Sequence, residues 1–214
     1  MSMDPQVSAR RAPRPPVLLA ALLLVMSAGC ATTGPDGEPA RLNLLSTQQE
    51  IALGRQLSEQ VEKEQLIHSD SWLQQYVRDI GELLARQSVR QDVQYQFTVI
   101  DNPETVNAFA LPGGHMYVYT GLILLCQSEA ELAGVMAHEI GHVAGHHHGE
   151  SLTRQMGAQI LLDLFLGPEA KPTQQQIGTL LATAVQLRFS RGQELESDRQ
   201  GMRMMVQALS LIHI

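Results

Sequence analysis

From residue 46 onward, apolar residues recur every three or four positions, which is the spacing of amphipathic helices. The first helix is expected to begin at Ser46 or Thr47, because Glu50 lies three residues after Thr47 and completes a capping-box pattern. Further helices are expected over residues 70–88, 121–126, 128–147, 151–166 and 174–190, and a last one near Gln193. The pattern therefore predicts a largely helical body.

A shorter stretch alternates apolar and polar residues instead, as a half-buried strand does. The alternation runs from Val93 to Val99, and Asp101-Asn102-Pro103 ends it. Residues 107–121, which read NAFALPGGHMYVYTG, predict two more short strands that meet at Pro112-Gly113-Gly114. The expected fold class is α+β, mostly helical with one small sheet.

The first thirty residues follow neither pattern. Three arginines precede an uninterrupted apolar run from Val17 to Met26, which is too short to span a bilayer because a spanning helix needs about 20 residues. Small residues then lead to Cys30, so residues 1–29 resemble a bacterial lipoprotein signal peptide, after which Cys30 is acylated. Residues 30–45 are expected to form a flexible tether between the lipid and the domain.

Composition and charge narrow the possible functions. The chain has 214 residues, of which 44% are hydrophobic and 17% are charged, as in one ordinary globular domain. The net charge is −7, whereas nucleic-acid-binding proteins usually carry a basic surface, so no nucleic-acid partner is expected. Two cysteines cannot form a disulfide scaffold. Six of the eight histidines lie between His115 and His148, and we expect the function there.

The segment His138-Glu139-Ile140-Gly141-His142 lies in the helix predicted over 128–147. On a helix, residues four apart are separated by about 40° around the axis, so the two histidines point the same way and can hold one metal ion. Glu139 lies about 100° from His138, close enough to take a proton from a water molecule on that metal. This arrangement is typical of zinc peptidases.

The sequence offers two candidates for a third metal ligand. His148 fits the longer metzincin pattern if the helix breaks at Gly145. On an unbroken helix, His148 would point about 80° away from His138. Glu194 is the other candidate, because it shares a helical face with Asp198, which could orient a ligand imidazole from one turn away.

Three ordered segments carry a family resemblance, and they read NAFALPGGHMYVYTG, ELAGVMAHEIGHVAGHH and RGQELESDRQG. They are similar to the zinc metallopeptidase family of the CAAX prenyl protease, the heat-shock protease HtpX and the Oma-type and BepA-like proteases. The similarity covers about residues 47–208 and implies a zincin-type domain of the gluzincin class, with the small sheet packed on the HExxH helix. The implied site residues are His138, His142 and Glu194 as ligands of one Zn²⁺, Glu139 as general base and Asp198 as the carboxylate behind a ligand imidazole.

The resemblance also implies that an extended substrate peptide pairs with one strand of the sheet, around either Asn107–Leu111 or His115–Tyr119. The candidate substrate-binding residues are Asn107, Ala108, Phe109 and His115. With Glu194 as the third ligand, the histidines at positions 146–148 are left as a cluster at the end of a helix, where positively charged imidazoles suit the helix dipole.

Together these features predict a zinc endopeptidase that is lipid-anchored on the periplasmic side of the cell envelope, with the outer membrane favoured, and that cuts misfolded or unassembled envelope proteins. The peptidase domain is expected over residues 46–208 and to be incomplete at its C-terminus, because residues 209–214 depart from the family pattern and resemble a non-native tail. Two alternatives stay open: a zinc-binding chaperone or adaptor without protease activity, and a metzincin-type protease that uses His148.

Overall fold

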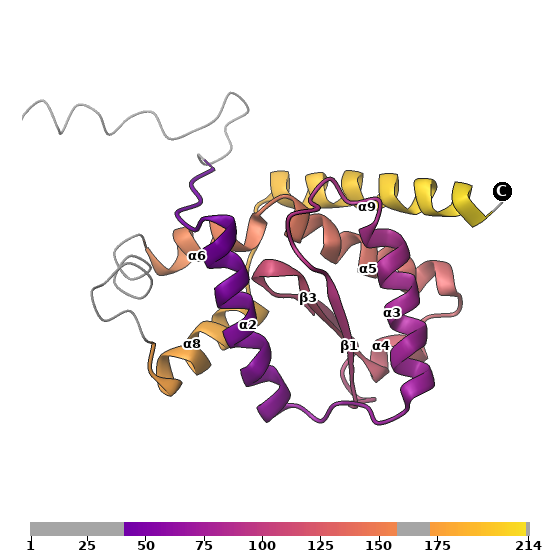
Figure 1. Ribbon diagram of the computed structural model, residues 1–214, viewed down its shortest axis with the longest axis horizontal. Coiled ribbons are helices and arrows are strands. Elements are labelled where there is room, and N and C mark those ends of the chain that lie inside the picture. The colour runs from indigo at the N-terminus through magenta and orange to yellow at the C-terminus, as the bar shows by residue number, and fades with distance from the viewer. Residues whose placement is uncertain (1–40, 158–171, 213–214) are drawn as a thin grey trace, which may run out of the picture. The chain divides into compact units, whose positions relative to one another are not determined.

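The computed structural model describes residues 41–157 and 172–212. The predicted signal peptide, Cys30 and the tether up to residue 40 lie outside the described residues, as do residues 158–166 of a predicted helix. The helices are α2 (Thr47–Glu64), α3 (Ser71–Ala85), α4 (Thr120–Leu125), α5 (Glu129–Ala144), α6 (His147–Met156), α8 (Gln174–Val185) and α9 (Arg191–Ile212). The strands are β1 (Gln96–Ile100), β2 (Ala108–Ala110) and β3 (His115–Tyr119) (Figure 1). Within the described ranges, no helix is long and apolar enough to cross a membrane.

The three strands form one sheet in the order β1-β3-β2, so β3 is the central strand (Figure 1). Strand β1 runs parallel to β3, and β2 runs antiparallel to it. Between β2 and β3 the chain turns through Pro112–Gly114, where Gly113 has a φ of 80° that favours glycine. The predicted pair of short strands is therefore present, and β2 is left with one edge that faces away from β3.

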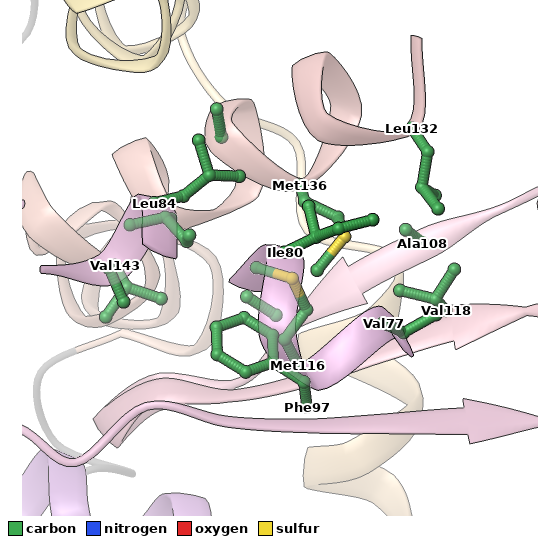
Figure 2. Close-up of a cluster of buried hydrophobic side chains, with 14 of the residues drawn as sticks. Val77, Ile80, Leu84, Phe97, Ala108, Met116, Val118, Leu132, Met136 and Val143 are labelled. Atoms are coloured by element: carbon green, nitrogen blue, oxygen red, sulfur yellow. The ribbon is translucent and has the colours of Figure 1, made fainter. Parts of the chain in front are cut away.

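Alternate residues of β3 point into apolar clusters on the two faces of the sheet. Met116 and Val118 pack with residues of α3, α5 and α9 (Figure 2), whereas Tyr117 packs with residues of α2 and α8. Met136 and Ile140 of α5 are fully buried in the first cluster. The helix that carries the HExxH motif thus packs directly on the sheet, which confirms the predicted α+β architecture.

The start of α2 differs from the predicted capping box. Ser46 caps the helix, and its partner is Gln49, whose side chain accepts a hydrogen bond from the Ser46 backbone N–H at 2.8 Å. Glu50, which was expected in that role, points into the protein and is only 1% exposed. It does so because Arg90, a buried cation, lies 2.6 Å from its carboxylate and pairs with it.

Two helices end earlier than the apolar pattern indicated. The helix expected over 128–147 stops at Ala144, because His146 adopts a left-handed backbone conformation with a φ of 57° and α6 then begins. The helix expected over 174–190 stops at Val185. The residues after Val185 contact α6 instead, where Arg154 donates a hydrogen bond to the Arg188 carbonyl at 2.9 Å.

Residues 41–45, expected at the end of the tether, belong to the folded domain. Arg41 forms an ion pair with Glu196 of α9, and Asn43 donates a hydrogen bond to Glu50 at 2.8 Å. The compact unit accordingly begins at Arg41 and not at residue 46.

Candidate metal centre

Helices α5 and α9 pack so closely that small residues are needed between them. A Cβ atom on Gly141 would lie 2.6 Å from Ser197 Oγ and 2.8 Å from Ser197 O, and one on Gly201 would lie 3.1 Å from the Ala137 backbone. Ser197 in turn donates a hydrogen bond to the backbone carbonyl of His138. The glycine inside the HExxH motif therefore allows α9 to lie against the turn of α5 that carries the two histidines.

Two histidines of α5 and one glutamate of α9 converge on one point. His138 Nε2 and His142 Nε2 are 3.0 Å apart, and Glu194 Oε2 lies 3.4 Å from the first and 3.8 Å from the second. The three ligand atoms all lie within 4.8 Å of one another. The fold thus brings Glu194 to two histidines that precede it by more than fifty residues in the sequence.

The geometry of these donors fits a divalent metal ion. In a tetrahedral site with bonds of about 2.0–2.1 Å, neighbouring ligand atoms lie about 3.3 Å apart. The three donor atoms are separated by 3.0, 3.4 and 3.8 Å, which is close to that value. Two imidazole nitrogens and one carboxylate oxygen also form the donor set of a catalytic zinc site, which keeps a fourth position for water or substrate.

Asp198, one turn after Glu194 on α9, contacts the other nitrogen of the His138 ring. Its Oδ1 lies 2.8 Å from His138 Nδ1. If Nδ1 carries the proton and donates it to this carboxylate, the His138 Nε2 is left with a free lone pair that faces the other two donors. Asp198 therefore has the position of a carboxylate that orients a ligand imidazole.

His142 is the most enclosed of the three donors. Its side chain is 2% exposed, compared with 29% for His138 and 46% for Glu194. The ring of Phe189 stacks on it with the centroids 3.9 Å apart. Burial, followed by the neighbouring histidines, lowers the pKa of His142 to about 2. The ring is therefore neutral at physiological pH, as a metal ligand must be.

The histidines after the motif do not form the charged cluster at a helix end that the sequence indicated. Because the helix breaks at His146, His147 and His148 lie in the first turn of α6, where they are 0% and 3% exposed. Burial is the main cause that lowers the pKa of His147 to about 4 and that of His148 to about 3. Both rings are therefore neutral, and a charge there would also oppose the dipole at a helix N-terminus.

The break in the helix at Gly145 meets one requirement of the alternative site that uses His148. However, His148 is hydrogen-bonded to the backbone of Ala110, and its ring centroid lies 6.3 Å from that of His142. In the described part of the chain, the donor group that could hold a metal contains Glu194 and does not contain His148. The geometry therefore favours Glu194 as the third donor.

Glu139, the residue after His138, faces the sheet. Its Oε2 accepts a hydrogen bond from the Ala110 N–H at 3.1 Å. Part of the residue is exposed, but protein atoms surround its carboxylate. This burial raises the pKa of Glu139 to about 7, although His138 and the Ala110 N–H each favour the charged form. A carboxyl group with a pKa near neutrality can both take up and release a proton.

The two predicted substrate-binding segments lie on strands with different places in the sheet. Strand β3 is paired on both sides, so the segment His115–Tyr119 has no free edge, whereas one edge of β2 has no partner strand among the described residues. His115 lies on the face of β3 that α2 covers, 3.5 Å from the Cβ position of Gly54. Since α5 packs on the opposite face, the structure does not bring His115 to the metal donors.

The peptide groups along β2 alternate between β3 and the free edge. Asn107 and Leu111 form backbone hydrogen bonds with β3, and Phe109, midway between them, faces β3 as well. The backbone groups of Ala108 and Ala110 therefore point to the free edge, where the Ala110 N–H meets Glu139. The free edge of β2 thus lies beside the candidate metal centre.

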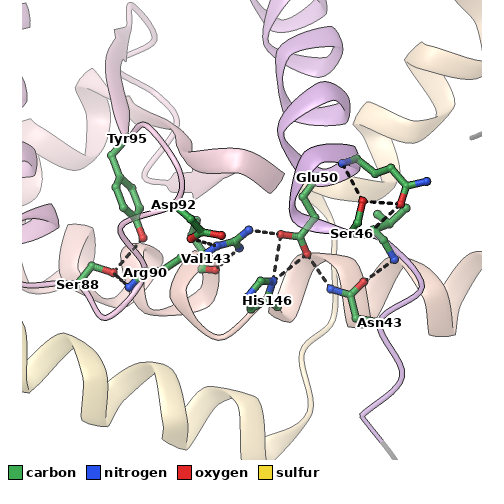
Figure 3. Close-up of polar contacts among 11 residues, drawn as sticks. Asn43, Ser46, Glu50, Ser88, Arg90, Asp92, Tyr95, Val143 and His146 are labelled. Atoms are coloured by element: carbon green, nitrogen blue, oxygen red, sulfur yellow. Dashed lines mark hydrogen bonds and ion pairs between the residues drawn. The ribbon is translucent and has the colours of Figure 1, made fainter.

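A buried polar cluster next to the centre was not foreseen from the sequence (Figure 3). Arg90 pairs with Glu50 and also donates a hydrogen bond at 2.8 Å to the carbonyl of Val143, in the last turn of α5. His146 Nδ1 lies 3.2 Å from the same glutamate. Arg90 is 40 residues from Glu50 and 53 from Val143, so no local pattern indicates the cluster. It ties the end of α5 to the start of α2.

Comparisons with known proteins agree with this site. The chain matches the model of peptidase family M48 over residues 71–211. It is 32% identical over 149 residues to the mitochondrial metalloendopeptidase OMA1 of Arabidopsis thaliana, an alignment that covers 68% of this chain and 29% of the relative. It is 31% identical over 207 residues to the beta-barrel assembly-enhancing protease of Yersinia pestis, and 28% identical over 205 residues to that of Escherichia coli, each covering 88% of this chain and 42% of the relative.

The chain spans less than half the length of these relatives. The part that matches the family model runs from the start of α3 into α9 and contains His138, Glu139, His142, Glu194 and Asp198. The family match and the convergent metal donors therefore concern the same region of the molecule. On this evidence the chain belongs to peptidase family M48.

Proposed function

We propose that the chain is a zinc-dependent endopeptidase that hydrolyses peptide bonds in misfolded or unassembled proteins of the cell envelope. The observation that carries the proposal is the convergence of His138, His142 and Glu194, with Glu139 beside them. Membership of family M48 supports a peptidase activity. The relatives named for β-barrel assembly support the choice of envelope proteins as substrates.

In this proposal each side chain of the centre has a separate role. His138, His142 and Glu194 hold the zinc ion, and Asp198 orients His138. When bound, zinc supplies Lewis-acid chemistry, which polarises a peptide carbonyl and makes a water molecule more acidic. Glu139 takes the proton of the attacking water at its carboxylate and passes it to the nitrogen of the leaving amine. Its pKa of about 7 supports this two-way transfer.

The substrate would bind as an extended peptide along the free edge of β2, by strand addition. Ala108 offers its backbone groups there, and the exposed Asn107 precedes it. Ala110 is already hydrogen-bonded to Glu139 and His148, so we assign the pairing to the Ala108 end of the strand. Phe109 contributes by holding the strand in place, because its side chain is buried in the core.

Replacing Glu139 by Gln tests the mechanism. Since Glu139 is not one of the three metal donors, the purified variant should keep one zinc ion per chain while casein cleavage falls by about 10²–10⁴-fold. Glu131→Gln, in the first turn of the same helix, is the control and should leave cleavage unchanged. Retained cleavage in Glu139→Gln would refute the proposed role. A wild-type chain that binds zinc and prevents casein aggregation without cleaving casein would support the chaperone alternative.

We also propose that the chain is exported and held at the periplasmic face of the envelope by a lipid on Cys30, with the outer membrane as the favoured site. The basic, apolar and small-residue segments before Cys30 support this assignment. In an expressing bacterium, Cys30→Ser should move the protein from the membrane fraction to the soluble fraction. A variant that stays in the membrane fraction would contradict lipid anchoring at this residue.

A further inference from the structure

The two candidate ligand imidazoles differ in what contacts their second nitrogen. A histidine that binds a metal through Nε2 must carry its proton on Nδ1, and the partner of that Nδ1–H fixes the tautomer and the orientation of the ring. For His138 the partner is the carboxylate of Asp198. For His142 it is another imidazole, because His142 Nδ1 lies 3.0 Å from His147 Nδ1.

The direction of this second contact follows from the positions of the other nitrogens. His142 Nε2 faces His138 and Glu194, so its proton belongs on Nδ1 when a metal is held there. His142 Nδ1–H then donates, and His147 Nδ1 accepts.

The far side of His147 agrees with this arrangement. With Nδ1 as acceptor, its proton must lie on Nε2, which is buried and has no hydrogen-bond partner among the described residues. Nε2 is 3.6 Å from Glu196 Oε2, too long for a hydrogen bond but close enough for the negative carboxylate to attract an N–H. Glu196 is itself held by Arg41. The contacts therefore run from His142 through His147 to an ion pair between Glu196 and Arg41.

We propose that His147 is a positioning residue of the metal centre: its imidazole accepts the Nδ1 proton of His142 and so keeps His142 Nε2 directed at the metal. This inference rests on the proposed metal site. A neutral acceptor suits this place, because His147 is fully buried and a carboxylate there would have to lose its hydration. Three carboxylates, those of Glu139, Glu194 and Asp198, already surround the centre.

Two variants of nearly equal shape separate positioning from simple packing. His147→Asn keeps an acceptor oxygen near the position of the imidazole Nδ1, whereas His147→Leu fills a similar volume without any acceptor. Zinc affinity is measured for both by competition with a chelating dye. We expect His147→Leu to bind zinc about 10–100-fold more weakly than the wild type, and His147→Asn to recover most of this loss. His148→Leu, a neighbouring buried histidine that is bonded to the Ala110 backbone instead, should leave the affinity unchanged.

A second readout needs no variant. In the zinc-loaded chain, nitrogen-15 NMR of the histidine rings should find the proton of His142 on Nδ1 and that of His147 on Nε2. A proton on His147 Nδ1 in the zinc-loaded chain, or equal zinc affinities in His147→Leu and His147→Asn, would overturn the inference. If His147→Leu does not fold, the Asn variant and the ring spectra still decide. A wild-type chain that binds no zinc would refute the proposed function, whereas a zinc-loaded chain with the proton on His147 Nδ1 would refute only the role of His147.

Discussion

The two histidines of the HExxH motif lie four residues apart on one helix, yet their surroundings are opposite in kind. His138 is 29% exposed, and the side chain of Asp198 that contacts it is 61% exposed. His142 is 2% exposed and is enclosed by the Phe189 ring and the neutral His147. Charged groups thus support the histidine that water can reach, and neutral groups support the one that water cannot. The difference follows the cost of removing charge from water.

The largest effect on stability is expected at the buried ion pair between Glu50 and Arg90, which lies near the end of α5 where His142 is enclosed. Their side chains are 1% and 4% exposed, so Glu50→Gln leaves the buried guanidinium with only the exposed Asp92 carboxylate, 3.3 Å away, as counter-charge. We expect a loss of about 3–5 kcal/mol in the free energy of unfolding, measured with urea. Glu82→Gln is the control, because it removes an exposed pair with Arg86 and should change stability by at most about 0.5 kcal/mol. Similar losses in both variants would contradict the contrast between buried and exposed sides.

A smaller effect on stability is expected at the close contact between α5 and α9, which brings Glu194 and Asp198 to His138. Gly141→Ala would place a methyl group 2.8 Å from the backbone oxygen of Ser197, so α9 must shift at a cost of about 1–3 kcal/mol in the free energy of unfolding. The shift should also weaken zinc binding, because α9 carries Glu194. Gly134→Ala in the same helix would meet only Met205 Sδ, at 3.7 Å, and should be neutral or stabilising by up to about 1 kcal/mol. Equal stabilities of the two variants in urea unfolding would contradict the claim that the contact between α5 and α9 requires a glycine at position 141.

A third effect, of about 1.4 kcal/mol per pH unit, concerns the buried neutral histidines near His142. His148 has a pKa of about 3 in the folded chain, lowered chiefly by burial, against about 6.5 when unfolded. Between these values the unfolded chain binds one more proton at this residue, so its contribution to stability is lost as the pH falls below about 6.5. His148→Leu should make the pH dependence of unfolding shallower by about 1.4 kcal/mol per pH unit between about pH 6 and 4. Urea titrations of the metal-free chain at several pH values measure this slope, and unchanged slopes would mean that His148 is protonated in the folded chain.

The spacing of residues along single helices predicted most of the metal centre around His138. His138 and His142 are four residues apart, as are Glu194 and Asp198, and such pairs share a helical face whatever the rest of the chain does. The strand pattern likewise predicted β1 and the two short strands β2 and β3, of which β2 has the free edge. The contact that joins the two helices was beyond such reasoning, because Ser197 and the His138 carbonyl are 59 residues apart in the sequence.

The buried surroundings of His142 depend on a break in the helix at His146, which no local sequence pattern indicates. The amphipathic pattern continues through residue 147, but the helix breaks at His146, next to the point where Arg90 binds the Val143 carbonyl and Glu50 contacts His146 Nδ1. The break moves His147 and His148 from a helix end in solvent to a buried first turn. Their expected charge was wrong for this reason, because burial rather than the helix dipole sets their ionisation.

The central claim is that Glu194 of α9 completes the metal centre formed by His138 and His142. The test is the zinc content per chain of two variants, Glu194→Ala and His148→Leu, measured by atomic emission after dialysis. Leucine keeps roughly the volume of the buried His148 side chain. The account predicts that Glu194→Ala loses its zinc and that His148→Leu keeps one ion per chain. Zinc retained in Glu194→Ala and lost in His148→Leu would contradict it.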